Sequence, residues 1–198
     1  QYQIPFTVFP PHTINPSSPE FRNQIETFDQ VCKIVKGMKR MTVGAIGART
    51  TAFKTVRFDE LALQKYGITT EALDMSEVFM RVRSLEMTSN KAKEKAEKLK
   101  GYSNFKNVPE RAFENLVRFG VAIDEIIDEY KLDTLALRCW IEMEKEFGVA
   151  PCVLLSELND RGIPAACELD VCNAVMMYAL RLASGKPATC LDWNNNYG

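Results

Sequence analysis

The run Ile163-Pro164-Ala165-Ala166-Cys167 decides the fold, because it is short, almost wholly apolar and followed at once by the polar stretch Glu168-Leu169-Asp170. A helical apolar pattern comes next, over residues 171–183, and a similar run, Thr134-Leu135-Ala136-Leu137, lies upstream. Short apolar strands that alternate with helices are typical of a parallel sheet covered on both faces. The sequence therefore predicts an α/β fold, a Rossmann-like three-layer sandwich with a mostly parallel sheet.

The same alternation extends outward from this stretch in both directions. Apolar runs predict further strands over residues 41–46, 70–74 and 188–191. Periodic apolar positions and helix-start signals predict further helices over residues 19–36, 57–66, 76–85, 89–100, 107–127, 141–147 and 152–159. Ser18 and Pro19 mark the start of the first helix, and five prolines upstream of residue 20 predict an extended arm before it.

Composition excludes several kinds of partner. The 25 basic and 26 acidic residues leave a net charge of −1, so we expect neither a nucleic acid nor an anionic membrane as a partner. The lysine-rich stretch 90–100 also contains Glu94 and Glu97, which favours a solvated helix face. No signal peptide or membrane span is recognisable, and a cytoplasmic location is expected.

The six cysteines show no regular spacing, and most lie within apolar stretches. This favours buried free thiols in a reducing compartment over a disulfide framework. A zinc site is disfavoured because the sequence has no Cys-x-x-Cys pair and His12 is its single histidine.

Polar residues follow each predicted strand. Because the carboxyl ends of parallel strands share one edge of a sheet, these exits should lie together. Carboxylates occur at three of them, which suits a hard divalent cation with oxygen ligands. The five exits are Gly47-Ala48-Arg49-Thr50, Asp74-Met75-Ser76-Glu77, Arg138-Cys139-Trp140, Glu168-Leu169-Asp170 and Asp192-Trp193-Asn194-Asn195-Asn196.

Structural roles compete with functional ones at these exits. Asp74 and Asp170 are placed to cap the helices that follow them, and Gly47 suits a tight strand-to-helix turn. Glu168 and Asp192 are different, because each ends a predicted buried strand, where an unpaired carboxylate is costly. Two carboxylates around one cation suit an aldose–ketose interconversion, in which a proton moves between C1 and C2 while the oxygens carry negative charge.

The segments around Glu168 and Asp192, with the helix pattern between them, resemble the L-fucose isomerase family, which is related to L-arabinose isomerase. In that family an Ala-x-Glu-x-Asp segment precedes such a helix, and a strand that ends in Asp follows it. The resemblance implies that Glu168 and Asp192, 24 residues apart (192 − 168), bind a manganese-type ion and act as the catalytic acid and base.

Two further segments extend the resemblance over roughly residues 40 to 198. Leu137-Arg138-Cys139-Trp140 is similar to a Gln-Arg-x-Trp segment of the family, with leucine in place of the glutamine, and Gly47-Ala48-Arg49 is like a Gly-Gly-Arg loop. The resemblance implies that Arg49, Arg138 and Trp140 line a sugar pocket. The amide-rich loop at Asn194 suits sugar hydroxyls as well.

The resemblance also implies a larger protein. Residues 1–40 would be an arm and leading helix, 41–187 a middle domain, and 188–198 the first strand of a truncated C-terminal domain. The family's N-terminal domain and a histidine metal ligand from its C-terminal domain have no match here. The expected complete enzyme is a homo-oligomer, a hexamer in this family, that uses Mn²⁺ (or Mg²⁺ or Co²⁺). This chain alone is expected to be inactive and to hold little or no metal.

Three alternatives remain open from the sequence. The chain could be a non-catalytic sugar-binding module of the same fold, or an oligomerisation domain in which Glu168 and Asp192 pair with internal arginines. It could also belong to a phosphosugar enzyme that uses the Gly47 loop as a phosphate cradle.

Overall fold

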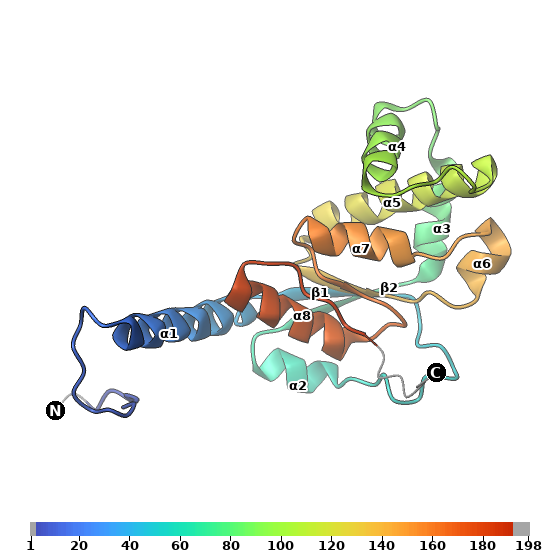
Figure 1. The fold of residues 1–198 in the computed structure, drawn as a ribbon. Coiled ribbons are helices and arrows are strands. Elements are labelled where there is room, and N and C mark those ends of the chain that lie inside the picture. Colours follow the sequence, from blue (N-terminus) through green and yellow to red (C-terminus); the bar gives the residue numbers. More distant parts are fainter. Residues whose placement is uncertain (1–2, 192–198) are drawn as a thin grey trace, which may run out of the picture.

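A parallel sheet forms the centre of the molecule in a computed structural model that describes residues 3–191 (Figure 1). Its strand order is β2-β1-β3-β4, and each neighbouring pair is parallel. The strands are β1 (Thr42–Ile46), β2 (Thr69–Leu73), β3 (Thr134–Leu137) and β4 (Ala165–Ala166). The predicted parallel α/β fold is confirmed.

Helices form the two outer layers. α2 and α8 cover one face of the sheet, and α3, α5 and α7 cover the other, with α4 packed against α5 (Figure 1). The helices are α1 (Pro19–Met38), α2 (Glu60–Lys65), α3 (Met75–Ser84), α4 (Asn90–Tyr102), α5 (Glu110–Tyr130), α6 (Glu142–Phe147), α7 (Cys152–Asp160) and α8 (Val171–Ser184). Of those between residues 3 and 191, none is both long and apolar enough to cross a membrane.

Strand alternation divides the core into two clusters. Val43 and Ala45 of β1 pack on the α8 side with Val175, whereas Ile46 packs on the other side with Phe119 of α5. Apart from the small Ala45, these residues have large apolar side chains. Each of the five is at most 5% exposed. A sheet buried on both faces explains why its strands read as continuous apolar runs.

Two strand predictions differ from the structure by more than one residue at an end. β4 contains only Ala165–Ala166 instead of residues 163–167, and residues 188–191 form no strand. Leu191 is 80% exposed, so the apolar run that ends there is not buried within the part of the chain that the structure describes.

Helix α1 begins as predicted, but its apolar face is not buried. The Ser18 hydroxyl accepts a hydrogen bond from the Phe21 N–H (3.2 Å), with Pro19 in the first turn. The helix contacts α8, where Gly37 lies against Leu182. No residue of α1 is buried, and its apolar positions remain largely open, as they do at Phe28, which is 61% exposed.

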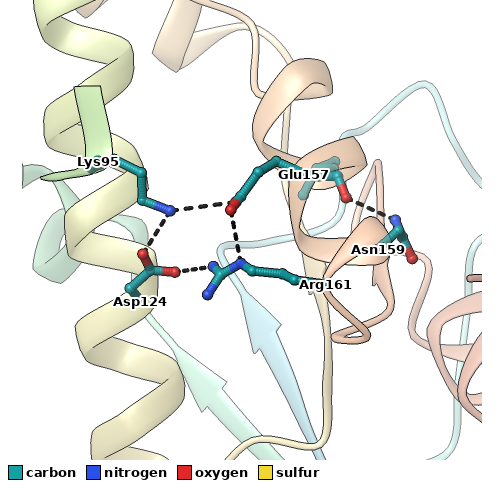
Figure 2. A network of polar contacts seen from close by, with 6 residues as sticks. Lys95, Asp124, Glu157, Asn159 and Arg161 are labelled. Atoms are coloured by element: carbon teal, nitrogen blue, oxygen red, sulfur yellow. Dashed lines mark hydrogen bonds and ion pairs between the residues drawn. The ribbon is translucent and has the colours of Figure 1, made fainter. Parts of the chain in front are cut away.

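The expectation of a solvated lysine-rich helix is wrong at one position of α4. Lys95 is only 4% exposed, and its Nζ lies 2.6 Å from Asp124 of α5 and 3.3 Å from Glu157 of α7. Arg161 closes the ring through ion pairs with Asp124 and, from its Nε at 2.9 Å, with Glu157 (Figure 2). Two basic and two acidic side chains thus form a closed network where three helices meet, so the buried Lys95 has carboxylate partners.

The cysteines form no disulfide among residues 3–191, but most of them are not buried, contrary to expectation. Only Cys139 is buried, and Cys167 is half-buried. The remaining four are exposed: Cys32, Cys152, Cys172 and Cys190. The cysteines on α1 and α8 face outward from their helices. Apolar neighbours in the sequence do not show whether a helix residue faces inward or outward.

Candidate functional site

Four of the predicted strand exits share one edge of the sheet. Because β1, β2, β3 and β4 are all parallel, Gly47, Asp74, Arg138 and Glu168 follow strands that end on the same side. This edge is where open α/β sheets place their ligands. The fifth exit, with Asp192 and Asn194, lies outside the described residues.

Two of the exit carboxylates cap helices, as the sequence suggested. Asp74 accepts a hydrogen bond from the Ser76 N–H (2.7 Å), and hydrogen bonds from Ser76 lower the pKa of the Asp74 carboxyl. Asp170 accepts from the N–H (3.0 Å) and the side-chain amide (2.7 Å) of Asn173 at the start of α8. Both carboxylates are therefore engaged in helix capping.

The loops after β1 and β3 are packed together. Gly47 has a φ of +92°, and a Cβ at this residue would lie 2.9 Å from the Arg138 Cβ. Further along, the rings of Phe53 and Trp140 meet edge to face with centroids 5.0 Å apart. Glycine is needed at position 47 both for its backbone conformation and for this close approach.

The two arginines at this edge have different partners. Arg138 donates to the Trp140 carbonyl (2.8 Å) and forms an ion pair with Glu142 (2.8 Å). Arg49 donates only to backbone carbonyls of its own loop, those of Thr50 (3.5 Å) and Phe53 (3.2 Å), and pairs with no carboxylate among the described residues. The buried hydroxyl of Thr50 likewise has no hydrogen-bond partner in residues 3–191.

Glu168 has an unusual backbone. Its φ is +61° and that of Leu169 is +62°, so two consecutive residues without glycine's freedom adopt the left-handed region. Such a conformation costs on the order of 1 kcal/mol or more at each residue, and it persists only where the surroundings enforce it. Here Leu169 is buried, and its N–H donates to the Leu137 carbonyl of β3 (3.4 Å). The segment that carries Glu168 is thus fixed against the neighbouring strand.

A groove of about 500 Å³ runs along the free edge of β4, between α7 and α8, and Glu168 lies on its wall. Polar groups surround it: Tyr102 and Ser156 share a hydrogen bond of 2.6 Å, and the Asn159 amide bonds both the N–H and the carbonyl of Ala165. Sequence reasoning missed these groove residues, because none of them follows a strand.

Cys139 connects the two parts of this edge. Its sulfur is hydrogen-bonded to the Cys167 thiol and to the backbone N–H groups of Glu168 and Trp140. The hydrogen bond from Cys167 is the main cause that lowers the pKa of Cys139 to about 7, and the same bond together with burial raises the pKa of Cys167. Nothing in the sequence spacing indicated this thiol pair.

The predicted site residues therefore fall into three groups. Glu168 lines the groove, whereas Arg49, Arg138 and Trp140 are not among its lining residues and gather at the neighbouring loops. Asp192 and Asn194 belong to the part that the structure does not describe. Between residues 3 and 191, no three His, Cys, Asp or Glu side chains form a group that could hold a metal ion.

Comparison with known proteins gives one recurring name. No protein-family model matches the chain. Over 180 residues it is 27% identical to a sulfoquinovose isomerase of Priestia aryabhattai, a match that covers 89% of this chain and 40% of that protein. A sulfoquinovose isomerase of Alkalicoccus urumqiensis is 26% identical over 174 residues, covering 87% of this chain and 39% of that protein.

A third relative, the sulfoquinovose isomerase of Clostridium sp. (strain MSTE9), is 26% identical over 170 residues, covering 83% of this chain and 37% of that protein. The chain thus spans about 40% of the length of the curated relatives it matches. These names agree with the expectation of a sugar isomerase, although the sugar they name is not L-fucose.

Proposed function

We propose that this chain is the α/β part of a longer aldose–ketose isomerase, in which Glu168 moves the proton between C1 and C2 of a sugar. The observation that carries the proposal is the placement of Glu168: it lies two residues after the parallel strand β4, lines a groove and has an enforced left-handed backbone. Carboxylates held in this way are suited to general acid–base catalysis. The relatives supply the reaction class, since each is named an isomerase of one sugar.

We further propose that the sugar carries an anionic group. Sulfoquinovose is a glucose derivative with a sulfonate on carbon 6, so a protein that accepts it needs a cation beyond the reacting carbons. Arg49 is the better candidate of the two edge arginines, because Arg138 already pairs with Glu142. The guanidinium group of an arginine can bind two oxygens of such an anion at once.

A divalent cation is also part of the proposal. Glu168 and Asp192 offer the carboxylate oxygens that Mn²⁺ and Mg²⁺ prefer. Residues 3–191 contain no group of three side chains that could hold a metal ion, and we propose that Asp192 and residues of the longer protein supply the remaining ligands. When bound, such an ion supplies positive charge beside the reacting sugar oxygens.

The test is an isomerase assay on the longer protein that contains this chain. Sulfoquinovose, glucose and L-fucose are supplied separately, with and without Mn²⁺, and products are followed by NMR. The proposal predicts Mn²⁺-dependent ketose formation from sulfoquinovose, with much less from glucose. An Arg49→Ala variant should lose most of this preference by raising the KM for sulfoquinovose while leaving that for glucose unchanged. Absence of ketose from all three sugars contradicts the proposal.

A further inference from the structure

Two cysteine side chains meet at the ends of neighbouring strands, close to Glu168. β3 and β4 are parallel and paired, with Leu135 opposite Ala165 and Ala136 opposite Ala166. Cys139 comes two residues after β3, and Cys167 one residue after β4. Strand pairing therefore brings the two residues together, and Cys167 is the main group that lowers the pKa of Cys139, while the two form no disulfide.

The pair can be reached from solvent through Cys167. Cys139 is 4% exposed, whereas Cys167 is half-buried and lines the groove along β4. A small oxidant in the groove can therefore contact Cys167 and has the second thiol directly behind it. Oxidation of a thiol with a neighbouring thiol ends in a disulfide rather than in further oxygen addition.

We propose that Cys139 and Cys167 form a reversible oxidation site, in which a hydroperoxide that enters the groove converts the two thiols into a disulfide. One sulfur attacks the hydroperoxide ROOH and breaks its O–O bond, which gives a sulfenic acid and the alcohol ROH. The second thiol then attacks the sulfenic sulfur, an S–S bond forms, and water leaves. In total, two thiols and ROOH give one disulfide, ROH and H₂O, and the hydroperoxide takes up the two electrons that the sulfurs lose.

The new bond would act directly on the segment that carries Glu168. Cys167 precedes Glu168, and the Glu168 N–H is hydrogen-bonded to the Cys139 sulfur. Forming the S–S bond removes both thiol hydrogens and draws the two sulfurs together, which would move the backbone of a segment already held in a left-handed conformation. This consequence for catalysis rests on the proposed function, whereas formation of the disulfide does not.

The test uses the 198-residue chain and hydrogen peroxide, with no activity assay. Free thiols are counted after denaturation, and peptides from an unreduced digest are identified by mass spectrometry. Free thiols should fall from six to four per chain, with one linked peptide pair that contains Cys139 and Cys167. Dithiothreitol should restore all six. Circular dichroism before and after treatment establishes that the chain stays folded.

Matched variants identify the pair. Cys152 and Cys190 also line the groove and are the competing partners for Cys167. The disulfide should form as before in Cys152→Ser and be lost in both Cys139→Ser and Cys167→Ser. A link from Cys167 to Cys152 or to Cys190, or oxygen addition to Cys167 without any link, overturns the proposal.

Activity then separates the two proposals. In the longer protein, peroxide should abolish isomerase turnover and dithiothreitol should restore it. If the Cys139–Cys167 bond forms in a protein without isomerase activity, the proposed function fails and the oxidation site stands.

Discussion

The side-chain amide of Asn159 pairs with the backbone of Ala165 in both directions: its Nδ2 donates to the Ala165 carbonyl, and its Oδ1 accepts from the Ala165 N–H, each at 3.1 Å. Ala165 belongs to β4, the edge strand of the sheet. Asn159 therefore takes the place of a further strand at this residue and satisfies backbone groups that would otherwise be left open. Glu168 follows shortly after the end of this strand.

Replacing Asn159 by Ala should lower the free energy of unfolding by about 2 kcal/mol, because two backbone groups lose their partner in a partly buried place. Urea denaturation followed by circular dichroism measures the change. Asn23→Ala on the exposed surface of α1 is the control and should change stability by less than about 0.5 kcal/mol. Equal effects in the two variants contradict this role of Asn159.

Lys95 provides a second prediction. Replacing it by Met removes the ammonium group and leaves Asp124 and Glu157 with Arg161 as their remaining partner. Loss of one member of a buried ion network should cost about 3 kcal/mol. Lys93→Met, on the exposed side of the same helix, serves as the control in urea denaturation and should be nearly neutral. A stabilised Lys95→Met variant would show that the network's charges are not needed for packing.

A glycine pair separates steric clash from backbone strain. Gly47 and Gly148 both have positive φ, +92° and +68°, but only at Gly47 would a Cβ meet another atom, the Arg138 Cβ at 2.9 Å. Gly148→Ala should cost about 1 kcal/mol for its left-handed conformation alone. Gly47→Ala should lower the free energy of unfolding clearly more than Gly148→Ala does, and it should lower the thermal midpoint further. Similar midpoints for the two variants would mean that the loops after β1 and β3 are not in close contact.

The Asp74 cap should make stability depend on pH. Its carboxyl has a lowered pKa in the folded chain, so its stabilising effect is present above the unfolded pKa of about 3.9 and is lost as the pH falls through the folded value. Asp74→Asn keeps a capping group but does not titrate. The difference in thermal midpoint between the wild type and this variant should shrink below about pH 4. A difference that stays constant down to pH 2 contradicts the lowered pKa.

Much of the fold was predictable because its strands are buried on both faces. The strand over residues 134–137 was predicted to the residue, and the caps at Ser18, Asp74 and Asp170 follow from local hydrogen-bonding chemistry. β4 came out shorter than predicted because its outer backbone groups bond to Asn159 and the chain turns left-handed at Glu168. An apolar run in the sequence indicates neither the hydrogen bonds to Asn159 nor the left-handed turn at Glu168.

Features that depend on distant residues escaped prediction. Lys95 fits into the interior because Gly120 of α5 has no side chain, and a Cβ there would lie 3.1 Å from the lysine's methylene carbons. The thiols of Cys139 and Cys167 meet only because β3 and β4 are neighbours in the sheet. Helical periodicity and motif spacing describe one segment at a time, whereas these contacts join segments that the fold brings together.

The most direct test of the account is the turnover of Glu168→Gln in the longer protein, measured with sulfoquinovose and Mn²⁺. Glutamine keeps the size of the side chain but cannot accept the proton, so kcat should fall by about a thousandfold while the protein stays folded. Glu144→Gln, on exposed α6, is the matched control and should keep wild-type turnover. A folded Glu168→Gln protein that retains more than about a tenth of wild-type kcat would contradict the assignment of proton transfer to Glu168.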